Sequence, residues 1–76
     1  MYKILIVEDD ETIAGGLKNH LEKWNYQAEC MTDFKDVMGK FVDFEPQLVL
    51  LDIVLPFFNG FHWCQEIRKI SKVPII

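Results

Sequence analysis

The sequence predicts an α/β domain built on a parallel sheet, and two observations support this prediction. Continuously apolar runs, such as residues 4–7 and 48–51, are typical of strands that are buried on both faces of a sheet. Segments with the three- and four-residue spacing of amphipathic helices lie between such runs. The resulting order is β-α-β-α-β-α-β with short connections, which predicts a doubly wound parallel sheet with right-handed crossovers. With 76 residues, the chain is expected to form one domain at most.

The first half of the chain predicts two strands around one helix. The first strand is expected over residues 3–7, the first helix over residues 11–24, and a second, edge-like strand over residues 26–31. Four apolar residues at spacings of four, four and three form one stripe of this helix: Ile13, Leu17, Leu21 and Trp24. Asp9 or Asp10 can cap its first turn, since a carboxylate accepts hydrogen bonds from the free amide groups there.

A second helix and a third strand are expected next. Thr32 or Asp33 is a suitable cap for the helix. Its apolar stripe consists of Phe34, Val37, Met38 and Phe41. Pro46 ends the connection into the third strand, residues 48–51.

The remainder of the chain predicts a loop, a third helix and the beginning of a fourth strand. Pro56 and the pair Asn59 and Gly60 indicate a loop with tight turns. The helix is expected from about residue 61 to residue 70, and residues 73–76 begin the fourth strand. One face of this helix is expected to present Phe61, Cys64 and Ile67.

Composition excludes several classes of function. The formal net charge of −4 argues against nucleic-acid binding by this segment, because neutralising phosphates requires clustered lysine and arginine. No apolar stretch is long enough to span a membrane, and the chain has no signal-peptide pattern. Cys30 and Cys64 lack metal-binding spacing and are interpreted as small buried hydrophobic residues, which is consistent with a reducing cytoplasm.

Acidic residues directly follow two of the expected strands. Glu8, Asp9 and Asp10 come after the first strand, and Asp52 comes after the third. If these strands are adjacent and parallel, their carboxyl ends lie about 4.8 Å apart, at the edge where open α/β sheets bind ligands. Glu8, Asp9 and Asp52 would then share one pocket, and three carboxylates favour a hard divalent cation such as Mg²⁺. The alternative is that these acids are ordinary solvated loop residues.

Three segments together resemble a bacterial response-regulator receiver domain, and in particular the N-terminal part of OmpR/PhoB-type transcription regulators. These segments are residues 4–10, residues 48–60 and residues 73–76. Residues 60–68 are similar to the subgroup that responds to peptide antibiotics such as bacitracin. The resemblance implies a flavodoxin-like receiver fold with strand order 2-1-3-4-5 and helices on both faces of the sheet.

The resemblance also implies roles for individual residues. Asp52 matches the aspartate that is phosphorylated in the family, and Glu8 and Asp9 match its Mg²⁺-binding acidic pair. The backbone carbonyl of Val54, two residues after Asp52, matches the third protein ligand of the metal. Asp10 matches a variable position and is better interpreted as a helix cap.

The family pattern also requires a Ser or Thr after the fourth strand and a Lys after the fifth, and the chain reaches Ile76 before either. We therefore expect residues 1–76 to be the N-terminal two-thirds of a receiver domain, truncated after the start of the fourth strand and without its effector domain. Without that Ser or Thr and that Lys, the chain is expected to retain metal binding rather than to be phosphorylated efficiently. Self-association is also expected, because the fourth strand and the stripe of the first helix would lose part of their cover.

The function implied is that of a phospho-acceptor in a two-component system. Asp52 would accept a phosphoryl group from a sensor histidine kinase, with Mg²⁺, to regulate transcription through a DNA-binding domain that the chain lacks. No enzymatic activity is expected beyond self-phosphorylation and dephosphorylation. One alternative is a metal-dependent phosphatase of the haloacid dehalogenase type with an aspartate nucleophile, which expects a second aspartate where Val54 stands. Another is a pseudo-receiver interaction fragment without chemistry.

Overall fold

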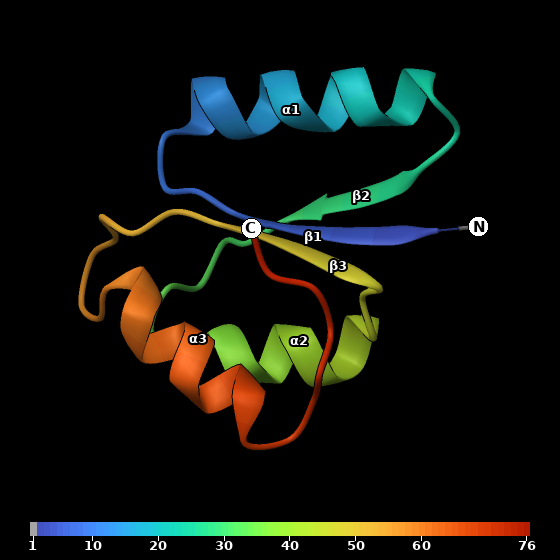
Figure 1. Cartoon of the computed structure of the whole chain (residues 1–76). Helices are drawn as coiled ribbons and strands as arrows, with labels where there is room; N and C mark the ends of the chain where they lie inside the picture. The colour runs from blue at the N-terminus through green and yellow to red at the C-terminus, as the bar shows by residue number, and fades with distance from the viewer. Residues whose placement is uncertain (1) are drawn as a thin grey trace.

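A parallel three-stranded sheet separates one helix from two others in the computed structural model, which describes residues 2–76 (Figure 1). The elements are β1 (Lys3–Val7), α1 (Glu11–Lys23), β2 (Gln27–Cys30), α2 (Val37–Phe44), β3 (Leu48–Leu51) and α3 (Gly60–Arg68). Helix α1 covers one face of the sheet, and α2 and α3 cover the other (Figure 1). The predicted α/β architecture with a parallel sheet is thus confirmed.

Strand β1 lies at the centre of the sheet, in the order β2-β1-β3. Its residues 4–7 are at most 2% exposed, as expected for a continuously apolar strand covered on both faces. The predicted fourth strand is present as a single parallel bridge between Ile75 and Val49. The Val49 amide donates to the Pro74 carbonyl at 2.9 Å, and the Leu51 amide donates to the Ile76 carbonyl at 2.8 Å. Residues 74–76 therefore extend the sheet on the far side of β3.

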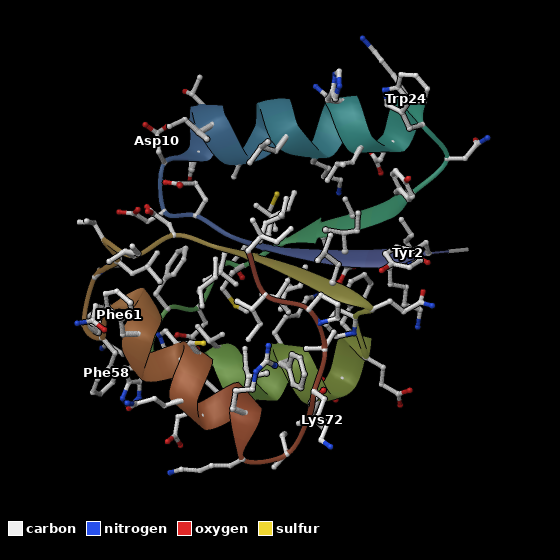
Figure 2. The ribbon with its side chains drawn as sticks, in the orientation of Figure 1. Tyr2, Asp10, Trp24, Phe58, Phe61 and Lys72 are labelled. Atoms are coloured by element: carbon white, nitrogen blue, oxygen red, sulfur yellow. The ribbon has the colours of Figure 1, made fainter. Side chains whose placement is uncertain are left out.

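Helix α1 contacts the sheet through Ala14 and Leu21, of which only Leu21 belongs to the predicted stripe. Ala14 is buried against Ile6, whereas Ile13 is 51% exposed and Trp24 is 69% exposed. The stripe is thus partly uncovered, which agrees with the expectation that it loses part of its cover, and Leu17 is 38% exposed. Figure 2 shows Trp24 at the periphery of the molecule.

Two aspartates begin the first two helices. Asp10 Oδ1 accepts hydrogen bonds from the amides of Thr12 and Ile13 at 3.0 and 3.3 Å, which confirms one of the two predicted caps of α1. Helix α2 begins later than predicted. Its cap is Asp36 rather than Thr32 or Asp33, because Asp33 forms a local turn by accepting from the amide of residue 35 at 3.0 Å.

Helix α3 begins at Gly60, where the side chain of Asn59 accepts from the amide of residue 62 at 3.0 Å. It ends at Arg68, two residues before the predicted end. Trp63 and Ile67 are buried with Gly60, whereas Phe61 is 62% exposed, so the face predicted for this helix is partly wrong. One residue corresponds to about 100° around a helix, which turns Phe61 away from the line of buried residues.

The described part of the chain gives two further checks on the sequence. Cys30 and Cys64 are both half-buried and form no disulfide with each other, so the prediction that they are small buried residues is partly met. The Cys30 thiol donates to the Ala14 carbonyl at 3.5 Å, where α1 meets β2. Within residues 2–76, none of the helices is long and apolar enough to cross a membrane.

Candidate functional site

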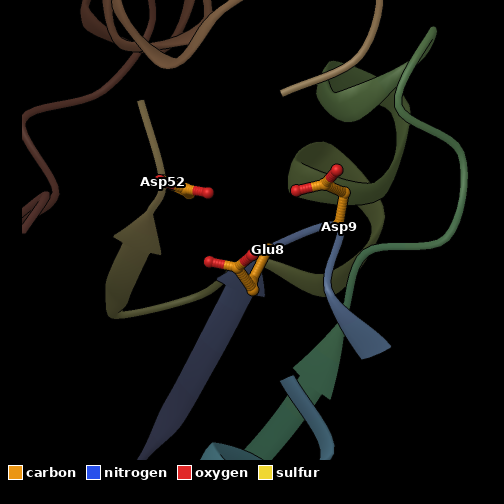
Figure 3. A group of neighbouring side chains, drawn as sticks. All are labelled: Glu8, Asp9 and Asp52. Carbon is orange, nitrogen blue, oxygen red and sulfur yellow. The ribbon is translucent and has the colours of Figure 1, made fainter. Parts of the chain in front are cut away.

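Three carboxylates meet at the carboxyl edge of the sheet (Figure 3). Glu8 and Asp9 follow β1, Asp52 follows β3, and one oxygen from each lies within 4.8 Å of the other two. Their proximity follows from the parallel register, in which Val7 is paired with Leu51, so that both strands end at the same level. The convergence predicted from the two acidic segments is therefore confirmed.

The main chain around Asp52 is fixed from two directions. The Asp52 amide donates to the Val7 carbonyl of β1 at 3.0 Å, and the Gly60 amide of α3 donates to the Ile53 carbonyl at 2.8 Å. On the β1 side, Glu8 accepts a hydrogen bond from the Asp10 amide at 3.1 Å. The carboxylates are thus held on main chain that belongs to the sheet and to the helix starts on either side of it.

Burial and mutual repulsion both disfavour the charged form of Glu8 at this site. Burial raises the pKa of the Glu8 carboxyl above its ordinary value, and the nearby carboxylates of Asp52 and Asp9 raise it further. The hydrogen bond from the Asp10 amide opposes this shift. The ion pairs found within residues 2–76 lie elsewhere, one between β2 and α2 and one at the end of α3. A bound cation would therefore remove a destabilising interaction.

The donor set fits a hard divalent cation. Carboxylate oxygens suit Mg²⁺, which retains several waters and is commonly bound by one or two carboxylates together with the oxygens of a substrate. Glu8 lines two adjoining cavities of about 220 and 280 Å³. Asp9 lines the first of these and Asp52 the second, so all three carboxylates border open space. Glu8, Asp9 and Asp52 are the residues that would hold the ion.

Val54 occupies the start of the loop after β3. Its side chain is 77% exposed, and its amide lies 3.4 Å from Asp52 Oδ1, which makes a long hydrogen bond. Metal binding by the Val54 backbone carbonyl stays a prediction.

The loop from Asp52 to α3 is anchored by aromatic contacts. Phe58 stacks on His62, with ring centroids 4.4 Å apart, and packs edge-to-face against Trp63 at 5.6 Å. Phe57 has a φ of 68°, which is unusual for a bulky residue, and its ring lies 4.7 Å from the Lys35 ammonium. The sequence indicated a loop here, but the pairing of Lys35 with Phe57 depends on tertiary contacts that no local pattern specifies.

A parallel α/β sheet with an acidic cluster at its carboxyl edge is the arrangement that the resemblance to receiver domains predicts. The family model described as the response regulator receiver domain matches residues 4–76. The chain belongs to this family. Receiver domains are phospho-acceptor switches and generally not enzymes.

Individual relatives support this assignment. The uncharacterized transcriptional regulatory protein YvcP of Bacillus subtilis is 53% identical over 76 residues, which are 100% of this chain and 32% of that protein. The solved N-terminal domain of the nisin resistance regulator NsrR, a lantibiotic response regulator, is 47% identical, with a TM-score of 0.91 over 99% of this chain and 63% of that chain. The chain thus spans about a third of the length of the curated relatives it matches.

Another similar solved structure is a complex of two proteins. It contains the histidine kinase ThkA and the response regulator TrrA, and TrrA comes from Thermotoga maritima. The match is 33% identical, with a TM-score of 0.87 over 99% of this chain and 66% of the matched chain. Together these findings favour the phospho-acceptor interpretation over the phosphatase and the pseudo-receiver, and Val54 stands where that phosphatase class has its second aspartate.

Proposed function

We propose that this chain receives a phosphoryl group on Asp52 in a two-component system. The observation that supports this proposal most directly is the convergence of Glu8, Asp9 and Asp52, whose oxygens lie within 4.8 Å of one another. Membership of the receiver family supplies the expected reaction, which is transfer from a phosphohistidine of a sensor histidine kinase. A complex of a kinase with a response regulator exists among the similar structures and supports this choice of donor.

In the proposed reaction, a carboxylate oxygen of Asp52 attacks phosphorus and forms an acyl phosphate. The bond between phosphorus and the imidazole nitrogen of the donor breaks, and its electron pair stays on the imidazole. Glu8, Asp9 and Asp52, with the backbone carbonyl of Val54, would hold Mg²⁺ at the acceptor. When bound, Mg²⁺ neutralises the repulsion between the carboxylates and the incoming phosphoryl group. The hydrogen bonds of Asp52 to β1 and of Ile53 to α3 keep the acceptor in place.

The remaining parts of the proposal concern partners and location. A cytoplasmic site of action, beside a sensor histidine kinase, is expected, as is control of transcription through a DNA-binding domain outside residues 1–76. The net charge of −4 disfavours direct nucleic-acid contact by this segment. Similarity to a lantibiotic response regulator favours the peptide-antibiotic subgroup.

The 76-residue polypeptide is expected to self-associate through the exposed residues of α1. Sedimentation at micromolar concentration tests this expectation.

The proposed reaction is tested with Mg²⁺ and a small phosphodonor such as acetyl phosphate. We expect slow formation of a hydroxylamine-labile adduct that mass spectrometry assigns to Asp52, and no adduct when EDTA replaces Mg²⁺. Asp52→Asn removes the acceptor, whereas Asp43→Asn makes the same chemical change at an exposed position of α2 and serves as the control. An adduct that persists in Asp52→Asn, or a wild-type chain that neither binds Mg²⁺ nor forms the adduct, would contradict the proposal.

A further inference from the structure

We infer that Gly60 is a positioning residue for Asp52, because the absence of a side chain at Gly60 lets the first turn of α3 rest directly on the main chain of the phospho-acceptor. This inference rests on the proposed function for its consequence, although the contact itself belongs to the fold. Sequence reasoning assigned Gly60 only to a tight turn.

The space beside Gly60 is filled by the backbone of the acceptor. A methyl group on its Cα would lie 2.2 Å from the carbonyl oxygen of Asp52 and 2.9 Å from its carbonyl carbon. It would also lie 2.9 Å from the Cα of Ile53. Contacts of a Cβ under 3.0 Å essentially never occur in proteins, and these neighbours are main-chain atoms that cannot rotate away. Any other residue at Gly60 must therefore displace Asp52 or the start of α3.

Conformation does not explain the glycine. Within residues 2–76, no glycine has a positive φ, so Gly60 is not needed for a left-handed turn. It is buried, and its amide donates to the Ile53 carbonyl at 2.8 Å. Because the Asp52 amide is bonded to β1 at 3.0 Å, the acceptor lies between a strand on one side and a helix start on the other.

The other glycines of the chain lack this feature. A methyl group on Gly15 or Gly16 would meet nothing within 4 Å. A methyl group on Gly39 would meet the carboxylate of Asp36, which is a side chain and can rotate at the cost of a cap. Only at Gly60 does the conflict involve the acceptor, and Gly16, which lines neither cavity at the carboxylates, is a matched control.

A displacement of Asp52 is expected to have a large effect on the reaction. Moving a methyl group from 2.2 Å to an ordinary contact requires a shift on the order of 1 Å, and a misplacement of that size can cost on the order of 100-fold in rate. Because Asp52 also belongs to the Mg²⁺ site, the affinity of the chain for Mg²⁺ should fall as well. Gly60→Ala is therefore expected to lower the rate of acyl phosphate formation by more than the loss of folded protein explains.

The test compares Gly60→Ala with two controls in the 76-residue chain. Gly16→Ala makes the same chemical change on α1, away from the cavities, and Asn59→Ala loosens the same start of α3 by removing its cap without pushing on Asp52. Each variant is measured by urea unfolding, by Mg²⁺ titration of the Asp52 amide resonance, and by the rate of acyl phosphate formation per folded molecule. We expect Gly60→Ala to shift the Asp52 resonance, to weaken Mg²⁺ binding and to reduce the rate by about 10- to 100-fold. Both controls should keep the wild-type rate within about twofold.

The inference is overturned if Gly60→Ala keeps the wild-type Asp52 resonance and Mg²⁺ affinity, or if Asn59→Ala loses as much per folded molecule. A wild-type chain that binds Mg²⁺ without forming the adduct contradicts the proposed phosphorylation, and the Asp52 resonance and Mg²⁺ affinity then decide the inference separately. If Gly60→Ala does not fold, the inference is tested instead by Mg²⁺ titration of the wild-type chain. Mg²⁺ must then shift the Gly60 amide together with that of Asp52, and an unmoved Gly60 amide rejects the contact.

Discussion

Replacing Asp52 with asparagine should make the metal-free chain more stable, although it removes the proposed acceptor. The Asp52 carboxylate has the carboxylates of Glu8 and Asp9 within 4.8 Å of its nearest oxygen, and no cation on the described chain pairs with any of the three. Asparagine keeps nearly the same shape and loses the charge. The stability change therefore isolates the repulsion that the site contains before it binds a cation.

The expected gain can be worked out from that spacing. Two unit charges 4.8 Å apart repel by about 0.9 kcal/mol in water, and physiological salt reduces this by roughly half. With two neighbouring carboxylates, Asp52→Asn should raise the free energy of unfolding by about 1 kcal/mol in EDTA. Mg²⁺ should reverse the order, because an ion at 100 times its dissociation constant stabilises the protein that binds it by about 2.7 kcal/mol.

Urea unfolding in EDTA and in saturating Mg²⁺ measures both effects, with Asp43→Asn as the control on α2. If Asp52→Asn is no more stable than Asp43→Asn in EDTA, the three carboxylates do not repel one another as the geometry requires. If both variants gain the same stability from Mg²⁺, Asp52 is not a ligand of the ion.

Other predictions concern a cap, the core and a titration. Asp10→Ala should lower the free energy of unfolding by about 1 kcal/mol in urea, since it removes the cap of α1, while Asp10→Asn should be nearly neutral. Ile67→Ala should cost about 2–5 kcal/mol at a fully buried position, whereas Ile70→Ala at an exposed one should stay within about 0.5 kcal/mol. The raised pKa of Glu8 contributes stability that is fully present below its ordinary pKa of 4.5 and is lost as the pH rises through the raised value. Glu8→Gln should therefore gain in stability over the metal-free wild type across that window.

Each of these predictions has an outcome that contradicts it. Equal stability of Asp10→Ala and Asp10→Asn would show that the cap is not formed in solution. Similar losses in Ile67→Ala and Ile70→Ala would place α3 in another orientation. A Glu8 carboxyl that titrates by NMR at or below 4.5 would remove the basis of the pH dependence. In Asp52→Asn the Glu8 pKa should fall only in part, because burial is the larger cause of its shift.

The parts of the fold that the sequence predicted well are those with strong local patterns. The continuous apolar runs gave β1 and β3 at the predicted residues, and the acids that follow them came together because parallel pairing brings strand ends to one level. Asp10 was correctly identified as a cap because capping depends on the next few amides only.

The errors arise where tertiary packing decides between local alternatives. Periodicity alone does not decide which residues of α1 face the sheet, and in the fold Ala14 is buried there while Ile13 is 51% exposed. Asp33 and Asp36 are equally suitable caps by type, and only the turn formed by Asp33 moved the helix start to Asp36. The role of Gly60 depends on its contact with the main chain of Asp52 and Ile53 in the folded chain, and no local sequence pattern reveals that contact.

The two tryptophans lie in opposite surroundings, which gives the chain an internal optical reporter. Trp24 is 69% exposed at the end of α1, whereas Trp63 is 5% exposed and its ring packs against Phe58 in the loop after Asp52. The Trp63 indole N–H finds no hydrogen-bond partner among the described residues, so its emission should be that of an indole in a dry environment. After Trp24→Phe, the tryptophan fluorescence of the chain comes from this one ring. Any movement of the loop that withdraws Phe58 should then appear as a red shift, without an attached dye.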